Sequence, residues 1–528
     1  ARVPKEGPLI IVSNHPFGGI DGLILASILH RVRPDVRILA NYMLHRIPDL
    51  REMFFFVDPF GGPEAQQRNL AGTKSSIRWV KQGGALAIFP AGEVSHLTMK
   101  RREVTDPHWL PTAGRLAQQT GASVLPLFFH GRNSLMFQLL GLIHPRLRTA
   151  WLGRELLNKR GRTVHVEIGN VIAPNRIAQF ETPEELTAYL RARTYLLRGR
   201  SDKTRMPVEK GTKSPKPRMQ TIAPAIKPEL LASEIASLPA GQLLAHSGKF
   251  TVYHATSAQV PQVLQEIGRL REVTFRAAGE GTGKATDLDR FDQTYRHLFV
   301  WHAESRKIIG SYRMGLTDEI TTKEGIGGLY TSTLFNFSRQ LLDQLGASME
   351  LGQSFVRAEY QKEFAPLMLL WKGIGHFVVQ NPKYRMLFGP VSISNEYASM
   401  TRNLLMAFLE VNNADHELGK MVTPKNPPRK VRLDDFAALA SSTIVQDVDQ
   451  VGELVEELES DRRGVPVLLR QYLKLNAKAL GFNVDPDFGD VLDALMVVDL
   501  TNVEPMILTR YMTREGMNSF LSQHSAMV

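Results

Sequence analysis

The chain has 528 residues, which is too many for one ordinary hydrophobic core, and two or three domains are expected. It contains no cysteine, which excludes disulfides, thiol catalysis and thiolate metal sites, and we predict no metal site. The net charge of +11 is uneven, because residues 1–250 carry 35 Lys and Arg against 19 Asp and Glu. Since no zinc pattern or basic–aromatic repeat points to nucleic acid, we predict no nucleic-acid partner and docking on an anionic membrane surface.

The first predicted element is a buried strand at Ile10–Val12 that leads into a loop with a histidine and an aspartate. In this pair His15 suits a general base, and Asp21 suits the carboxylate that orients its imidazole. A structural role for both residues in the loop is the alternative.

Two further strand-to-loop blocks follow, at 85–93 and 123–131. With the first block they resemble the glycerolipid acyltransferase family, whose motifs are Asn-His…Asp, Phe-Pro-Glu-Gly-Thr-Arg and Val-x-Pro-Val. The resemblance implies fatty acyl transfer from a thioester to a hydroxyl, with His15 as base and Asp21 as its partner. It also implies that Gly92, Glu93 and Pro126 belong to substrate-binding segments.

The chain departs from this family twice. Five residues separate His15 from Asp21 where the family has four, and we expect Gly18-Gly19 to absorb the extra residue. Val94 replaces the arginine associated with the acceptor phosphate, and valine cannot bind a phosphate. We therefore predict an acceptor without a phosphomonoester, unless Arg51 or Arg132 fills the role, and surface charge is the simpler interpretation of both.

Helical stretches at 73–82, 113–120 and 181–198 alternate with the apolar runs, which predicts an α/β fold. For the apolar run 135–143 we favour a buried core helix, with a helix in the membrane interface as the alternative. No stretch has the roughly 18–20 apolar residues of a spanning helix. No secretory signal peptide is seen, and we expect the natural N-terminus to precede Ala1.

Domain boundaries follow from composition. We predict an O-acyltransferase domain at 1–200, a basic Pro- and Lys-rich linker at 201–245 and a second domain at 246–528.

The second half carries an acidic segment between a glycine-rich loop and a strand-like run. The spacing of Gly279, Gly281, Gly283 and Lys284 fits neither the P-loop nor the dinucleotide fingerprint, so a phosphate site is not favoured. Asp287, Asp289 and Asp292 then precede the strand-like run 297–302, and strands with Arg313 and Glu350 follow. A solvated loop or helix cap is the alternative for the three aspartates.

This order is similar to that of acyl-homoserine-lactone synthases and, over residues 250–510, closer to the ornithine N-acyltransferases. The resemblance implies an acetyltransferase-like α/β fold that moves an acyl chain to an amino group. Carboxylates at Asp287, Asp289, Asp292 and Glu350 would hold the acceptor ammonium, and Glu350 or an aspartate would take its proton. Arg313 and Arg357 would bind the acceptor carboxylate or the phosphopantetheine of the donor, with ordinary salt bridges as the alternative.

The nature of the acyl donor is predicted from a missing glycine-rich loop. Acetyltransferases cradle the CoA pyrophosphate with a glycine-rich loop after the strand that corresponds to 349–356, whereas here Arg357-Ala358-Glu359 follows without glycine. We therefore favour acyl-acyl carrier protein over acyl-CoA as co-substrate, with no bound cofactor.

Both halves together resemble the fused bacterial ornithine lipid synthases. The resemblance implies N-acylation of ornithine with a 3-hydroxyacyl chain, O-acylation of the resulting lyso-aminolipid, and a peripheral location on the cytoplasmic face of the bacterial inner membrane. Three alternatives stay open: a lysophospholipid acyltransferase with a non-catalytic acyl-binding second half, an aminolipid synthase for glycine, lysine or glutamine, and a membrane-surface adaptor without activity.

Overall fold

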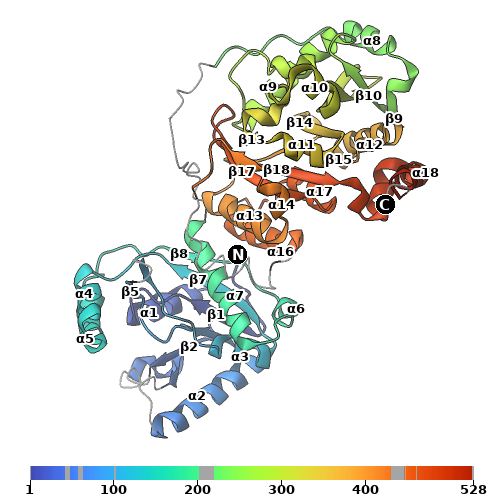
Figure 1. The fold of residues 1–528 in the computed structure, drawn as a ribbon. Coiled ribbons are helices and arrows are strands. Elements are labelled where there is room, and N and C mark those ends of the chain that lie inside the picture. The colour runs from blue at the N-terminus through green and yellow to red at the C-terminus, as the bar shows by residue number, and fades with distance from the viewer. Residues whose placement is uncertain are drawn as a thin grey trace. The chain divides into compact units, whose positions relative to one another are not determined.

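The structure is a computed structural model that describes residues 2–41, 48–57, 63–99, 103–200, 219–429, 445, 447–459 and 461–525. Its contacts divide the chain into two compact units (Figure 1). Unit 1 contains residues 1–200, 433–445 and 453–463, and unit 2 contains residues 201–432, 446–452 and 464–528. A short segment from late in the sequence therefore belongs to the first unit.

Unit 1 is built on a six-stranded sheet in the order β3-β2-β4-β1-β7-β8, parallel except for the β7–β8 pair. A small β5–β6 hairpin lies outside this sheet. The main elements are β1 (Leu9–Ser13), α1 (Gly19–Leu29), β2 (Val36–Asn41), η2 (Pro48–Met53), β3 (Phe54–Val57), α2 (Pro63–Lys81), β4 (Ala85–Ile88), β5 (His96–Thr98), β6 (Glu103–Thr105), α3 (Thr112–Thr120), β7 (Ser123–Phe129), α4 (Leu135–Ile143), α5 (Pro145–Leu157), β8 (Val166–Ile168), α6 (Pro174–Ile177) and α7 (Pro183–Leu196).

The central strands of unit 1 are apolar on both faces, as expected of parallel strands covered on both sides. On one face Leu9 and Ile11 pack with Leu25 and Leu29 of α1 in a single core cluster. On the other face α7 contacts β1 and β7. The chain returns repeatedly to the carboxyl ends of these strands, so the loops after β1, β4 and β7 meet at one edge of the sheet.

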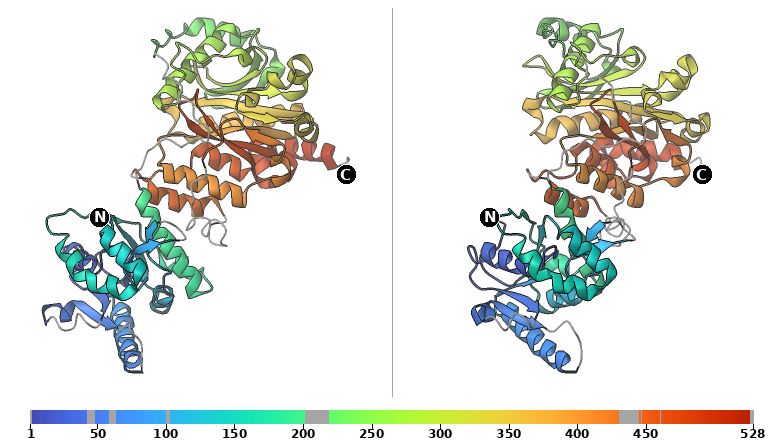
Figure 2. Two further views of the ribbon diagram at one scale, coloured as in Figure 1. Left: turned by 60° about the vertical axis from the view of Figure 1, so that its left-hand side comes forward. Right: turned by 90° about the vertical axis from the view of Figure 1, so that its left-hand side faces the viewer.

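Unit 2 is built on an eight-stranded sheet in the order β17-β18-β15-β14-β12-β11-β10-β9, in which only β14 and β15 are parallel neighbours. Figure 2 shows it from two further sides, from green β9 and β10 to orange-red β17 and β18. Its elements are α8 (Pro228–Ala236), β9 (Leu243–Ser247), β10 (Phe250–Thr256), α9 (Pro261–Ala277), η5 (Arg290–Gln293), β11 (Arg296–His302), β12 (Lys307–Leu316), α10 (Thr317–Glu324), β13 (Phe335–Phe337), α11 (Arg339–Leu345), β14 (Ser348–Val356), η8 (Ala358–Tyr360), α12 (Phe364–Gln380), β15 (Met386–Ile393), α13 (Ser399–Asn412), α14 (His416–Gly419), β16 (Val422–Pro424), α17 (Val467–Lys474), β17 (Lys478–Asp485), β18 (Val491–Asp499) and α18 (Pro505–Ser525). The helix α16 (Val448–Leu458) is divided between the units, with residues 448–452 in unit 2 and 453–458 in unit 1.

Two predictions about organisation need correction. Residues 201–218 of the predicted linker lie outside the described residues, but 228–236 form α8, whose Leu231 and Ile235 are buried in the core of unit 2. Their spacing of four residues is that of a helix with one buried face. The core helix favoured for 135–143 is also wrong: α4 forms there, but Leu135 and Ile143 are each 73% exposed.

Candidate acyltransferase sites

The loop between β1 and α1 brings His15 and Asp21 together. Gly18 has a φ of +89°, a conformation that favours glycine, and it turns the chain into α1. Asp21 lies in the first turn of α1, where its Oδ2 accepts hydrogen bonds from the backbone N–H groups of Phe17 and Gly18 at 2.9 and 3.0 Å. The extra residue in the loop is therefore accommodated within the helix start.

The His15 imidazole is oriented by this carboxylate. His15 Nδ1 lies 2.9 Å from Asp21 Oδ2, and the ring stacks on Phe89 with a centroid distance of 4.3 Å. Asp21 is fully buried, and burial raises the pKa of its carboxyl, whereas the hydrogen bond to His15 acts in the opposite direction. An ionised Asp21 can only accept a hydrogen bond, so Nδ1 carries the proton beside it and Nε2 has the lone pair that can accept a proton.

The backbone of His15 is held by residues that the sequence analysis missed. Its N–H donates to Asp106 Oδ1 at 3.1 Å, and its carbonyl accepts from Ser95 N at 2.8 Å. Buried Asp106 also accepts hydrogen bonds from the Ser95 hydroxyl and from the Trp109 indole. No motif marks Asp106 or Trp109, because their role depends on contacts between distant loops.

The other predicted residues of unit 1 have different surroundings. Gly92, with a φ of +66°, lies in the turn after β4. Next to it Glu93 forms an ion pair of 2.9 Å with Arg148, and Val94 is buried. Pro126 lies within β7 opposite Val12 of β1, inside the sheet and away from the loops.

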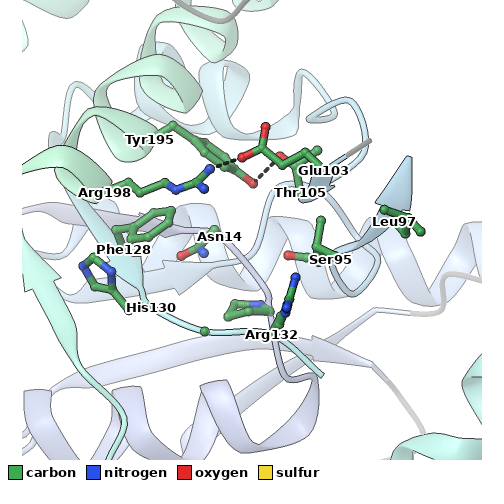
Figure 3. A pocket seen from close by; sticks show the side chains of 13 residues that line it. Asn14, Ser95, Leu97, Glu103, Thr105, Phe128, His130, Arg132, Tyr195 and Arg198 are labelled. Carbon is green, nitrogen blue, oxygen red and sulfur yellow. Dashed lines mark hydrogen bonds and ion pairs between the residues drawn. The ribbon is translucent and has the colours of Figure 1, made fainter. Parts of the chain in front are cut away.

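A pocket of about 390 Å³ lies beside the His15 loop (Figure 3). Asn14 and Pro16, the neighbours of His15, line it, and Asn14 also bonds to the backbone of Phe129, which fixes the loop to β7. Two arginines line the same pocket. Arg198 pairs with Glu103, whereas no ion pair is found for Arg132 among the described residues. Arg51, in η2, is not among the lining residues.

In unit 2 the strand register brings the predicted residues onto one face of the sheet. His297 of β11 is opposite Arg313 of β12, and Glu350 of β14 is opposite Gly315 of β12. Arg313 and Gly315 point to the same face because side chains alternate along a strand. Gly315 is required here, because a Cβ atom would lie 2.4 Å from the Tyr295 ring.

Arg313 is the centre of a buried ionic cluster. Its Nη1 lies 2.7 Å from Asp289 Oδ1 and 3.3 Å from Asp292 Oδ1, and Arg271 Nη1 lies 2.7 Å from the same Asp292 oxygen. Burial acts to raise the pKa of Asp292, but the charges of Arg271 and Arg313 outweigh it and hold this pKa well below its usual value. Arg271 was missed because it lies on α9, 21 residues before Asp292, and no motif links the helix to the acidic segment.

Several buried polar atoms around this cluster have no protein hydrogen-bond partner in the described part of the chain. They are Asp287 Oδ2, His297 Nδ1, and the Nε and Nη2 atoms of Arg271 and Arg313. Burial raises the pKa of Asp287 to about 6 and lowers that of His297 to about 4. Buried polar groups normally find partners, so these atoms mark a place for a ligand or water with both cationic and anionic groups.

Glu350 is next to this cluster, but both of its carboxylate oxygens already accept hydrogen bonds from the protein. Oε2 accepts from the Tyr295 hydroxyl and from Tyr330 N, and Oε1 accepts from Thr331 N at 2.6 Å. Burial raises the pKa of both Glu350 and Tyr295, so the hydroxyl stays protonated and donates. This arrangement is that of a residue that positions its neighbours.

Arg357 lies apart from the other predicted residues. It follows β14 directly, seven residues after Glu350, which is about 23 Å along an extended strand. Its N–H bonds to the Ile309 carbonyl and its guanidinium pairs with Glu359 at 2.9 Å.

A second group of buried carboxylates was not predicted. Asp493 lies on β18 between Ser392 of β15 and Asn483 of β17, and it accepts a hydrogen bond of 2.6 Å from the Ser392 hydroxyl. Burial raises the pKa of Asp493, and also that of Asp485 to about 6. Within the described residues neither carboxylate has an ion-pair partner, and Asn483 Nδ2 has no hydrogen-bond partner.

The parallel strands β14 and β15 pair only over Ser348–Glu350 and Met386–Phe388 and then separate. Beyond Glu350 each strand continues beside a different neighbour, β12 or β18. The chain leaves β14 into η8. Among the described helices, none combines the length and apolar character needed to cross a membrane.

The comparisons with known proteins also divide the chain into an N-terminal and a C-terminal part. Residues 1–204 match the family model described as acyltransferase, and residues 270–372 match that of the acetyltransferase (GNAT) domain. A glycine N(alpha)-acyltransferase of Phocaeicola vulgatus is 31% identical over 323 residues, covering 58% of this chain and 95% of that relative. A lyso-glycine lipid O-acyltransferase of the same species is 29% identical over 207 residues, 37% of this chain and 70% of that relative.

Among solved structures, the 1-acyl-sn-glycerophosphate acyltransferase PlsC of Thermotoga maritima covers 37% of this chain and 68% of its own length, with 19% identity and a TM-score of 0.25. The two family models and the glycine N(alpha)-acyltransferases show that the chain is an acyltransferase with an N-terminal acyltransferase domain and a C-terminal GNAT domain, and that it belongs to the family of the glycine N(alpha)-acyltransferases.

Proposed function

We propose that this chain makes a diacylated amino-acid lipid in two steps. Unit 2 would transfer a 3-hydroxyacyl chain to the amino group of an amino acid, and unit 1 would then acylate the hydroxyl of that chain. The observation that supports this most is the presence of an N-acyltransferase-like and an O-acyltransferase-like domain on one polypeptide, whose relatives carry the two complementary names. A shared chain keeps the intermediate close to the second site.

In the first step an aspartate of the cluster takes a proton from the ammonium, and the free amine attacks the thioester carbonyl. A C–N bond forms, the C–S bond breaks, and the departing thiolate takes the second proton from the nitrogen. The ionic cluster of unit 2 supports the binding of a zwitterion, since Arg271 and Arg313 have unused N–H groups and Asp287 has an unused oxygen. We propose that the guanidiniums bind the carboxylate of the acceptor amino acid and that the aspartates bind its ammonium group. Glu350 acts through Tyr295 as a positioning residue, because both its oxygens are occupied.

In the second step the hydroxyl of the lyso-aminolipid attacks a second thioester. His15 Nε2 takes the hydroxyl proton as the C–O bond forms, and it returns this proton to the departing thiolate. Asp21 holds the imidazole in the required tautomer and stabilises its protonated form. The acceptor has a carboxylate instead of a phosphomonoester, which agrees with Val94 at the position of the family arginine.

Two observations point to different amino acids. The names of the relatives favour glycine. The resemblance to ornithine lipid synthases favours ornithine, whose second ammonium would find carboxylates without a cation partner at Asp485 and Asp493. For the donor we propose acyl carrier protein, because no glycine loop for a CoA pyrophosphate follows β14. We place the enzyme peripherally on the cytoplasmic face of the inner membrane.

The test is an assay of the purified full-length chain. It is incubated with labelled glycine or ornithine and with 3-hydroxyacyl chains on acyl carrier protein or on CoA. We expect a monoacylated amide and, after addition of a second acyl donor, a diacylated product. His15→Ala should stop at the monoacylated amide. Acylation of a lysophospholipid without any amide would identify an ordinary lysophospholipid acyltransferase and contradict the proposal.

A further inference from the structure

The largest group of exposed apolar side chains lies on the helical pair α4–α5 of unit 1. Leu135, Ile143 and Leu157 are 73, 73 and 75% exposed. Five more large apolar residues of the pair are exposed: Met136, Leu139, Leu142, Leu147 and Leu156. Figure 1 shows the two helices as a pair at one side of the unit. Soluble proteins rarely expose a contiguous apolar patch of this kind without a partner for it.

The opposite face of the pair is anchored to the candidate site of unit 1. Phe137 is buried, and Gln138 Oε1 accepts a hydrogen bond of 2.8 Å from Leu97 N. Arg148 of α5 is buried and pairs with Glu93, and Leu152 packs so closely on Gly18 that a Cβ atom there would lie 3.1 Å away. The helices are therefore firmly packed on the loops around His15, and their apolar residues are exposed in the folded unit.

The charged residues of the helical pair itself are nearly all basic. Residues 132–162 contain seven Lys and Arg and a single acidic residue, Glu155. Glu155 is buried and bonds to Ser134 and Lys159, so it adds no negative charge to the surface. Arg146 and Arg154 are exposed on α5, and Arg154 lies over the Trp151 ring at 4.8 Å. An apolar face flanked by Trp and Arg is the composition of helices that lie in a membrane interface.

We infer that the α4–α5 pair inserts its apolar face into the headgroup region of an anionic phospholipid bilayer, with its arginines on the lipid phosphates. A bilayer fits because the surface combines apolar side chains with cations and exposes no acidic residue of its own. The pair would hold the His15 loop against the surface where an amphiphilic acceptor resides. This role in bringing the His15 loop to its acceptor rests on the proposed function, whereas the binding of α4–α5 to the bilayer does not.

Vesicle binding without any substrate tests the inference separately from catalysis. The double variant Leu139→Ser/Ile143→Ser removes two exposed apolar side chains, and Val467→Ser/Met506→Ser is the matched control in unit 2, where both residues are also exposed. On vesicles of phosphatidylcholine and phosphatidylglycerol we expect at least a tenfold loss of binding for the first variant and less than twofold for the control. Arg146→Gln/Arg154→Gln should remove the preference over pure phosphatidylcholine. Unchanged binding of the first variant would overturn the inference.

A second measurement locates the inserted residue directly. Because the chain has no cysteine, Ile143→Cys or Val467→Cys gives one site for an environment-sensitive fluorophore. Anionic vesicles should shift the emission to shorter wavelength at position 143 and leave it unchanged at 467. Equal shifts at both positions, or none at 143, would overturn the inference. A shift at 143 that grows with protein concentration without vesicles would identify a second copy as the occupant and would also overturn it.

Discussion

His15 Nδ1 and Asp21 Oδ2 lie 2.9 Å apart although five residues separate the two side chains in sequence. The contact forms because the chain turns at Gly18, and Asp21 Oδ2 then accepts hydrogen bonds from the backbone N–H groups of Phe17 and Gly18, just before α1. One carboxylate oxygen thus closes the helix start and orients the imidazole at the same time. Changes at Asp21 should therefore affect catalysis through the orientation of His15.

Asp21→Asn should lower the O-acylation rate by about 10²- to 10⁴-fold, because the amide cannot stabilise a protonated His15. The asparagine carbonyl can still accept from Phe17 N and Gly18 N, so the fold should persist. The measurement is the initial rate of O-acylation of a synthetic lyso-aminolipid across pH, with N-acylation by the same preparation as the internal control. An unchanged O-acylation rate would show that Asp21 is not the partner of the base.

Arg132→Gln should raise KM for a lyso-aminolipid acceptor about 10- to 100-fold with little change in kcat. Arg132 lines the pocket beside the His15 loop and has no ion pair among the described residues, so it is available for the acceptor carboxylate. The methyl ester of the acceptor lacks this negative charge, so its KM should be the same for wild type and variant. The matched control is Arg198→Gln, since Arg198 already pairs with Glu103. A similar loss on the ester would rule out carboxylate recognition.

Glu457→Gln should destabilise unit 1 by about 3–5 kcal/mol, the typical cost of breaking a buried ion pair. Glu457 belongs to unit 1 through the segment 453–463, is buried against Arg193, and also accepts from Asn170 N at 2.7 Å. Thermal unfolding by calorimetry measures the effect. Breaking the exposed Arg198–Glu103 pair with Glu103→Gln is the control, and it should cost less than about 1 kcal/mol. Equal unfolding temperatures of Glu457→Gln and wild type would contradict a stabilising role of the segment 453–463 in unit 1.

Glu280→Gln should make unit 2 more stable at alkaline pH. Burial raises the pKa of Glu280 from 4.5 to about 7, so the folded state favours the protonated form. Its contribution to stability is fully present below pH 4.5 and is lost as the pH rises through 7. The variant should therefore gain about 1–3 kcal/mol in urea unfolding at pH 8.5 and little at pH 5. The exposed Glu304→Gln serves as control, and a gain independent of pH would contradict the assignment.

The parts of the fold that depend on local pattern were predictable. The apolar runs at 10–12, 85–88 and 123–129 are strands of unit 1, and the stretch predicted at 181–198 contains α7. The motif loops could also be placed, since carboxyl ends of parallel strands meet at one edge. For 135–143 the sequence indicates an apolar helix, but only tertiary packing decides whether that helix is covered, and here most of it is not.

The rest depends on contacts between distant segments. Arg271 reaches Asp292 only because α9 packs on the sheet, and Asp106 reaches His15 from 91 residues away. Glu457 enters unit 1 from 264 residues after Arg193. Neither spacing nor composition indicates such pairs. The residue types allow Glu350 or an aspartate as the proton acceptor, and only the hydrogen bonds of Glu350 indicate a positioning role for it.

The most direct test of the two-step account is lipid mass spectrometry of a bacterial host without aminolipids that expresses the wild type, His15→Ala or Arg313→Met. The account predicts a diacylated aminolipid from wild type, its monoacylated amide from His15→Ala, and neither lipid from Arg313→Met, with all three proteins present at equal levels. If His15→Ala still makes the diacylated lipid, or if wild type changes only the acyl composition of the phospholipids, the account is wrong.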